Sequence, residues 1–161
     1  MTAQIFCEPD PLQRAAICRD ILATLPDWFG IPEAVENYIV EAAALPMLVA
    51  RETGQDGDGT ALGFATITVE SADTIELHLI AIRPEAHRRG IGRLLLDGAE
   101  ALALQGGYAF LSVKTLAPSV EDRNYAATRA FYTAIGFEPY EETPDFWGPD
   151  TPCLVMRKPL R

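Results

Sequence analysis

The stretch that decides the fold is Ile80-Ala-Ile-Arg-Pro-Glu-Ala-His-Arg-Arg-Gly-Ile-Gly-Arg-Leu-Leu-Leu96. An apolar strand ends before Pro84, a basic turn containing Gly90 and Gly92 follows, and an amphipathic helix begins at once. Glycine lets the main chain come close to a ligand, and the first N–H groups of a helix lack internal partners and lie at the positive end of its dipole. Three side chains add full charges: Arg88, Arg89 and Arg93. The pattern therefore predicts a binding site for a diphosphate.

The spacing of the glycines excludes two other nucleotide sites. A P-loop ends in Gly-Lys-Ser/Thr, which this turn lacks, and the dinucleotide fingerprint requires a third glycine where Leu95 stands. The alternative structural interpretation is a plain strand–turn–helix, in which the glycines only form the turn and the arginines are solvated.

Length and charge limit the class of protein. The chain has 161 residues, 48% of them hydrophobic, so we expect a single domain over residues 1–161. The formal charge is 13 − 23 = −10, and an acidic protein repels nucleic acid and anionic lipid but attracts a cationic amine. We therefore expect neither a nucleic-acid nor a membrane partner. Against this acidic background, the arginines near Gly90 indicate a local anion site.

The cysteines and the N-terminal residues predict a cytoplasmic protein. Cys7, Cys18 and Cys153 are scattered, odd in number and without a CxxC pair, so they predict free thiols rather than a zinc site or a disulfide framework. No secretory signal and no apolar run of membrane-spanning length is apparent. No cluster of metal ligands is apparent either, so we expect no metal.

Hydrophobic periodicity predicts one mixed α/β domain. Strands are predicted at 4–7, 47–52, 61–69, 74–82, 108–114, 137–142 and 152–157. Helices are predicted at 11–25, at 33–44, from Gly90 to the Gly106-Gly107 stop, and at 124–135. Residues 54–59 are almost all Gly and Asp and predict a turn. The resulting order is β-α-α-β-β-β-α-β-α-β-β.

This order and two motifs resemble the GNAT (Gcn5-related N-acetyltransferase) superfamily. The turn His87-Arg88-Arg89-Gly90-Ile91-Gly92 is similar to the coenzyme A motif Gln/Arg-x-x-Gly-x-Gly/Ala, with His87 departing from the first position. The block from Asn124 to Phe137 resembles Asn-x-x-Ala-x-x-Leu-Tyr-x-x-x-Gly-Phe, in which Tyr132 matches, Asn124 lies one residue early, and Thr128 replaces an alanine. The resemblance covers nearly the whole chain and implies the GNAT fold.

The resemblance also implies acetyl-CoA as cosubstrate and places its binding site. In the family the strand before the glycine turn bulges and leaves main-chain groups free for the pantetheine arm, which implies Ile80, Ala81 and Ile82 here. The turn from His87 to Arg93 would hold the diphosphate. The later helix would add three residues to the coenzyme site: Asn124, Thr128 and Phe131.

Acetyl transfer needs a base for the amine and an acid for the departing thiolate. The resemblance places the Tyr132 hydroxyl near the coenzyme sulfur and implies the acid. Ala127, Ala130, Phe131 and Ala134 form an apolar stripe on the same helix, and Tyr132 lies about 100° away from Phe131. A tyrosine that only lines a pocket wall is the alternative interpretation.

The base candidates lie on the strand at 74–82. Alternation places Glu76 and His78 on one face, and charged groups on an otherwise apolar strand are unusual because their burial is unfavourable. Many family members have a glutamate base here, whereas histidine has the more suitable intrinsic pKa. The alternative is that either residue caps the strand or pairs with a neighbour.

We therefore predict an N-acetyltransferase that moves an acetyl group from acetyl-CoA directly to an amine of a small molecule. Two alternatives stay open: a protein or peptide N-acetyltransferase, and a non-catalytic acyl-CoA-binding regulatory module. Five aromatic residues either line the acceptor site or form core edges: Trp28, Phe29, Tyr38, Phe146 and Trp147. A homodimer is possible, since dimers are common among such enzymes.

Overall fold

The computed structural model describes residues 2–53 and 59–160, so the turn predicted at 54–59 lies outside the described residues except for Gly59. The chain divides into two compact units, each described by itself. The first comprises Met1–Thr68 with Leu77–Leu102, and the second comprises Val69–Glu76 with Ala103–Arg161. Within the described residues, no helix is both long enough and apolar enough to cross a membrane.

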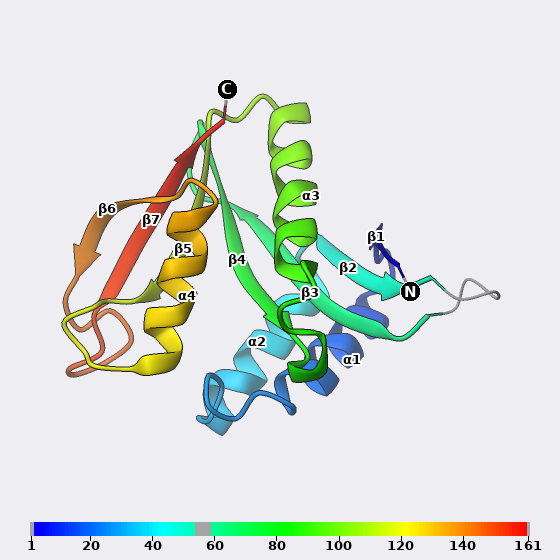
Figure 1. The fold of residues 1–161 in the computed structure, drawn as a ribbon, viewed down its shortest axis with the longest axis horizontal. Coiled ribbons are helices and arrows are strands. Elements are labelled where there is room, and N and C mark those ends of the chain that lie inside the picture. The colour runs from blue at the N-terminus through cyan, green and yellow to red at the C-terminus, as the bar shows by residue number, and fades with distance from the viewer. Residues whose placement is uncertain (1, 54–58, 161) are drawn as a thin grey trace. The chain divides into compact units, whose positions relative to one another are not determined.

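Elements follow the predicted order, which is confirmed (Figure 1). The helices are α1 (Pro11–Leu22), α2 (Pro32–Ala44), α3 (Ile91–Gln105) and α4 (Arg123–Ala134), and a 3-10 turn spans Pro84–Ala86. The strands are β1 (Ala3–Cys7), β2 (Met47–Glu52), β3 (Ala61–Val69), β4 (Thr74–Ile82), β5 (Phe110–Leu116), β6 (Glu138–Thr143) and β7 (Cys153–Pro159). They form one mixed sheet in the order β1-β2-β3-β4-β5-β7-β6, and β4 contributes residues to both units.

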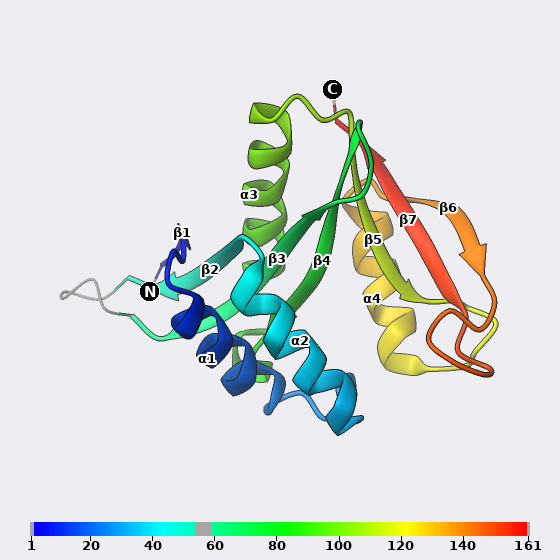
Figure 2. The ribbon, with the colours of Figure 1, turned by 180° about the vertical axis from the view of Figure 1, so that it is seen from behind.

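In the first unit, α1 and α2 lie side by side on one face of the strands and α3 lies on the other (Figures 1 and 2). Ile17, Ile21 and Ile39 of the two helices share a buried cluster with residues of β2, β3 and β4. On the α3 side, a Cβ atom added to Gly98 would lie 3.2 Å from Leu48 Cδ1, so the absence of a side chain lets α3 approach β2 closely.

Local chemistry explains where α1 begins and ends. The Asp10 side chain accepts a hydrogen bond from the Leu12 N–H, and Pro11 occupies the first turn. The helix ends at Leu22 rather than at the predicted residue 25. Leu25 N–H instead donates to Leu22 O in a tighter turn, because Pro26 disfavours helical backbone in the residue before it.

In the second unit, β7 pairs antiparallel with both β5 and β6. The predicted strand 108–114 is displaced to Phe110–Leu116, because Gly107, at φ +80°, and Tyr108 still belong to the turn after α3. The N–H groups of Ala109 and Phe110 then both donate to Asp73 O. Strand β6 is exposed over most of its length and its register shifts between Pro139 and Glu141.

Candidate functional site

The turn that follows β4 in the first unit is closed by His87. This residue ends the 3-10 turn, and its Nε2 atom lies 2.8 Å from the carbonyl oxygen of Ile82. Its ring also contacts the Trp28 ring edge-on, with the ring centroids 6.1 Å apart. His87 therefore connects the turn to the end of β4 and to Trp28.

Two residues of the turn have left-handed backbone: Arg88 at φ +64° and Gly90 at φ +78°. The first helical hydrogen bond of α3 runs from Leu94 N–H to Gly90 O. The amides of Ile91 and Gly92 precede that bond, at the positive end of the helix dipole. A Cβ atom on Gly90 would meet nothing within 4 Å. The turn thus combines a glycine with open space at its Cβ position and the first amides of a helix, and helix N-terminal amides are groups that bind phosphate.

The predicted arginines around this turn lie at the surface. Arg89 pairs with Glu52 at 3.4 Å, and Arg93 pairs with Asp97 at 3.6 Å along α3. Exposed ion pairs of this kind contribute little to stability. Breaking either ion pair would therefore reduce the stability of the fold very little, so both guanidinium groups can turn to an anion such as a diphosphate.

The candidate residues of β4 directly precede this turn. Ala81 is buried in the cluster beneath α1 and α2, while Ile80 and Ile82 are partly exposed. A Cβ atom on Gly63 of β3 would lie 2.9 Å from Ala81 O, so glycine is required for β3 to lie this close to β4. The Ile82 carbonyl oxygen accepts the hydrogen bond from His87 described above.

His78, also on β4, is held by α2. Its Nε2 atom lies 3.2 Å from Glu41 Oε1, and the Tyr38 ring packs against the imidazole with centroids 6.0 Å apart. The predicted pairing with a neighbour is therefore present. A carboxylate beside an imidazole orients the ring and stabilises its protonated form.

Glu76 belongs to the second unit and is only 4% exposed. Its carboxylate forms an ion pair with Lys114 of β5, which also contacts Glu70 at 3.3 Å. Desolvation alone would lower the pKa of the Lys114 amine, but the hydrogen bonds and charges of Glu76 and Glu70 outweigh it and raise the pKa above its usual value. Sequence reasoning missed Lys114, because a lysine at the predicted end of a strand is typical of a solvated position.

Tyr132 is the buried residue of α4, and its position corrects the helical face inferred from sequence. Ala127, Ala130 and Ala134 are exposed, whereas Tyr132 packs against the rings of Phe131 and Phe137. Tyrosine buries far more apolar area than alanine, so it determines which side of the helix faces inward. Desolvation raises the pKa of the Tyr132 hydroxyl, with a smaller contribution from Tyr125, so the phenol keeps its proton.

The start of α4 carries the other candidates. Asp122, which directly precedes α4, is the N-cap, and its carboxylate accepts hydrogen bonds from Asn124 N–H and Tyr125 N–H. Thr128 Oγ1 donates to Asn124 O, and Phe131 is half-buried beside Tyr132. The cap thereby fixes where Asn124 and Thr128 lie on the helix.

Comparison with known proteins identifies the family. A family model described as an acetyltransferase (GNAT) domain matches residues 45–139, more than half of the chain. The chain belongs to the GNAT acetyltransferase family. The enzyme class that the sequence predicted is thus confirmed.

Solved structures share the fold of this GNAT acetyltransferase at low identity. A GNAT-family protein from Desulfovibrio desulfuricans is 22% identical, with a TM-score of 0.80 over 99% of this chain and 100% of that one. The ribosomal-protein-S18-alanine N-acetyltransferase of Escherichia coli is 19% identical, with a TM-score of 0.73 over 99% and 94%. An aminoglycoside 6'-N-acetyltransferase complexed with coenzyme A is 18% identical, with a TM-score of 0.71 over 100% and 98%. No curated protein matches the sequence.

The aromatic candidates for the acceptor site of this GNAT acetyltransferase fall into two groups. Trp28, Phe29 and Tyr38 pack against the core of the first unit as its edge. Phe146 and Trp147, in the loop before β7, are exposed and contact each other edge-on. Over residues 2–53 and 59–160, no group of three or more His, Cys, Asp and Glu side chains is placed to hold a metal ion.

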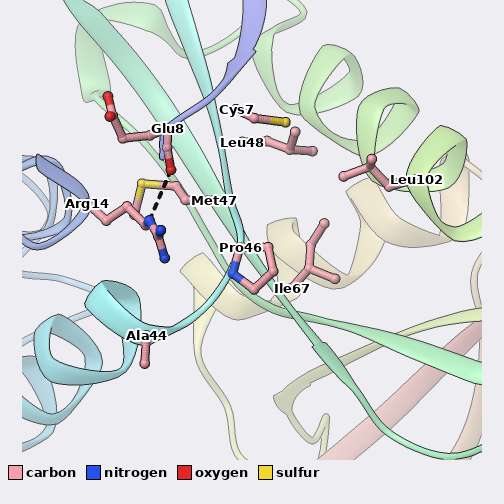
Figure 3. A pocket seen from close by; sticks show the side chains of 9 residues that line it. All are labelled: Cys7, Glu8, Arg14, Ala44, Pro46, Met47, Leu48, Ile67 and Leu102. Carbon is pink, nitrogen blue, oxygen red and sulfur yellow. Dashed lines mark hydrogen bonds between the residues drawn. The ribbon is translucent and has the colours of Figure 1, made fainter. Parts of the chain in front are cut away.

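The first unit also contains a pocket of about 310 Å³ that includes none of the predicted site residues (Figure 3). Arg14 lies at its edge and donates hydrogen bonds to the carbonyl oxygens of Glu8, Pro9, Ala43 and Leu45. The thiol of Cys7 and the side chains of Leu48 and Leu102 line its apolar part. Four N–H groups of the bounding arginine already donate to carbonyl oxygens and the pocket is otherwise largely apolar, so it offers little to bind a diphosphate.

Proposed function

We propose that this GNAT acetyltransferase transfers an acetyl group from acetyl-CoA directly to an amine of a small molecule. The observation that carries the proposal is the turn at the start of α3, where Gly90 in left-handed backbone leads into a helix N-terminus whose first amides precede the first helical hydrogen bond. The diphosphate of coenzyme A is an anion of the kind that such a turn binds. Arg88, Arg89 and Arg93 supply the neighbouring positive charges.

The chain's own titratable groups account for the proton transfers. Glu76 or His78 takes the proton from the attacking amine, directly or through a water molecule, as the C–N bond forms. Tyr132 gives its proton to the coenzyme sulfur as the C–S bond breaks, and proton exchange with solvent restores it. The Tyr132 hydroxyl is protonated throughout the neutral range, as a proton donor must be, although burial raises its pKa and so makes it a weaker acid.

The acidic composition favours an amine acceptor that carries positive charge in solution. A protein or peptide N-terminus and a non-catalytic acyl-CoA-binding role are the competing functions. A panel of small amines and short peptides assayed with acetyl-CoA separates the three. Faster transfer to a small amine supports the proposal. Faster transfer to a peptide would mean that the acceptor is a protein or peptide. Binding of acetyl-CoA without transfer to any of these acceptors would mean that the protein is a non-catalytic binding module.

Calorimetric titration tests coenzyme binding directly. Wild type should bind acetyl-CoA with a micromolar dissociation constant and should not bind ATP or NAD, and the Arg88→Ala/Arg93→Ala variant should bind acetyl-CoA at least about tenfold more weakly. If wild type did not bind acetyl-CoA, the turn would have only a structural role and the proposed function would be refuted.

The choice of base is tested by the pH dependence of kcat/KM in Glu76→Gln and His78→Gln. Loss of the acidic limb in one variant identifies that residue as the base. An unchanged profile in both variants would exclude both.

A further inference from the structure

Lys114 joins two carboxylates of the second unit. Its Nζ atom pairs with Glu76 Oε2 on β4 and lies 3.3 Å from Glu70 Oε2, on the turn that precedes β4. One carboxylate comes from β4, the other from the turn that precedes it, and the lysine comes from β5. The arrangement is a cation held between two anions.

Burial makes the pair with Glu76 different from a surface ion pair. The side chain of Glu70 is 46% exposed, whereas that of Glu76 is 6% exposed. A buried carboxylate without a cation takes up a proton, because water no longer stabilises its charge. Lys114 supplies that cation, and its raised pKa keeps it charged over the neutral range.

Two of the titratable groups described near Lys114 and Glu76 add no positive charge there. Lys114 pairs with Val155 and Leu116 pairs with Cys153, so the side chains of Cys153 and Lys114 lie on one face of the sheet. Burial raises the pKa of the Cys153 thiol to about 11, so it is neutral, and the charge of Glu141 raises that pKa further. Along β4, the imidazole of His78 is engaged by Glu41.

We propose that Lys114 is a positioning residue that keeps the Glu76 carboxylate ionised and in one orientation for acetyl transfer. The inference rests on the function proposed above, in which Glu76 is a candidate base. A carboxylate must be ionised to accept a proton or to order a water molecule for the amine. Lys114 exerts its effect through Glu76.

The test is the titration of Glu76 in protein labelled with ¹³C at the glutamate carboxyl carbons, with the signal assigned by its loss in Glu76→Gln. The wild-type titration of this carboxyl is the reference. In Lys114→Met, which keeps the length of the side chain but not its charge, it should titrate at least about one pH unit higher. Lys114→Arg should restore the wild-type titration. Circular dichroism and the Tm of each variant verify that it is folded.

Glu70→Gln is the matched control, because it removes the other carboxylate on Lys114 and leaves the pair with Glu76. In this variant Glu76 should titrate within a few tenths of a pH unit of wild type, because the exposed Glu70 carboxylate interacts only weakly with Lys114. A second readout is the kcat/KM profile, whose acidic limb should move to higher pH in Lys114→Met and not in Glu70→Gln.

Two results overturn the inference. Titration of Glu76 at the same pH in wild type and Lys114→Met means that the lysine does not hold the charge. A shifted titration with an unchanged kcat/KM profile means that the charge is not used in the reaction. The carboxyl titration needs no substrate, so failure of wild type to acetylate any amine would refute the proposed function without altering the test of the ion pair.

Discussion

The Nε2 atom of His87 donates its proton to the carbonyl oxygen of Ile82, at a distance of 2.8 Å. His87 is also the residue that departs from the Gln or Arg of the coenzyme A motif. The departure is therefore conservative in its chemistry, because a glutamine amide can donate a hydrogen bond to the same carbonyl oxygen. The interaction links the last residue of β4 to the turn that begins α3.

His87→Ala should leave the Ile82 carbonyl without this donor and loosen the turn. We expect the dissociation constant of acetyl-CoA to rise about three- to tenfold and the free energy of unfolding to fall by about 1 kcal/mol. His87→Gln should recover most of both quantities. Calorimetry and urea unfolding measure them, and equal weakening in the two variants would mean that the hydrogen bond has no part in shaping the turn.

Gly90→Ala should weaken coenzyme binding through the backbone rather than through a clash. Gly90 has φ +78° with open space where a Cβ atom would lie, and alanine in left-handed backbone loses about 1 kcal/mol. Gly107→Ala is the matched control, because Gly107 has φ +80°, the same open space, and no place in the predicted site. Both variants should lose similar stability, but only Gly90→Ala should lose affinity for acetyl-CoA. If Gly90→Ala and Gly107→Ala bound acetyl-CoA with equal affinity, the turn at Gly90 would not be part of the coenzyme site.

Tyr132→Phe should lower kcat at least about tenfold, with little change in the dissociation constant of acetyl-CoA. The substitution removes one hydroxyl and keeps the ring that packs against Phe131 and Phe137. Phe137→Leu, which alters the packing around the same ring without touching a titratable group or a predicted coenzyme contact, serves as the control for indirect effects. Unchanged turnover in Tyr132→Phe would eliminate the acid role.

The three cysteines should differ sharply in reactivity. Cys7 is exposed, whereas burial raises the pKa of Cys18 to about 12 and that of Cys153 to about 11. At pH 8, a thiol reagent should modify one thiol per native chain and three in denaturant, and Cys7→Ser should abolish the native reaction. Modification of a second thiol in the native protein would contradict the burial of Cys18 and Cys153.

The same two thiols predict an alkaline loss of stability. Their pKa values in the folded protein exceed the usual value of 9.0, so the unfolded chain releases these protons first. Their contribution is complete below pH 9 and decreases as the pH rises toward about 11 and then about 12. Urea unfolding between pH 8 and pH 11 should show a falling free energy, with a smaller fall in Cys18→Ala. A fall of equal size in that variant would assign the effect to other groups.

Sequence periodicity was sufficient for elements whose apolar residues are large. The strands 47–52, 61–69 and 74–82 have the predicted bounds, and each buries large apolar side chains, such as Leu48, Phe64 and Leu77. It was insufficient for α4, whose alanines suggested the wrong inward face while Tyr132 determined the actual one. Small side chains bury too little area to orient a helix.

For the candidate site, sequence reasoning found the turn and the charged residues but not their partners. Lys114 is 38 residues from Glu76, and Glu41 is 37 residues from His78. Nothing in local spacing marks such pairs, because they depend on which strands and helices become neighbours. The role of Asp122 was also missed, although an aspartate directly before a helix is a usual N-cap signal.

Strand β6 has a consequence for how copies of this chain meet. It lies at one end of the strand order, and a free strand edge is a template on which another chain can add a strand. Here Pro139 offers no N–H donor, the register is broken next to it, and Glu138, Glu141 and Glu142 are exposed along the edge. Two such edges brought together would oppose six carboxylates, so the strand is protected against edge-to-edge addition of a second copy of itself.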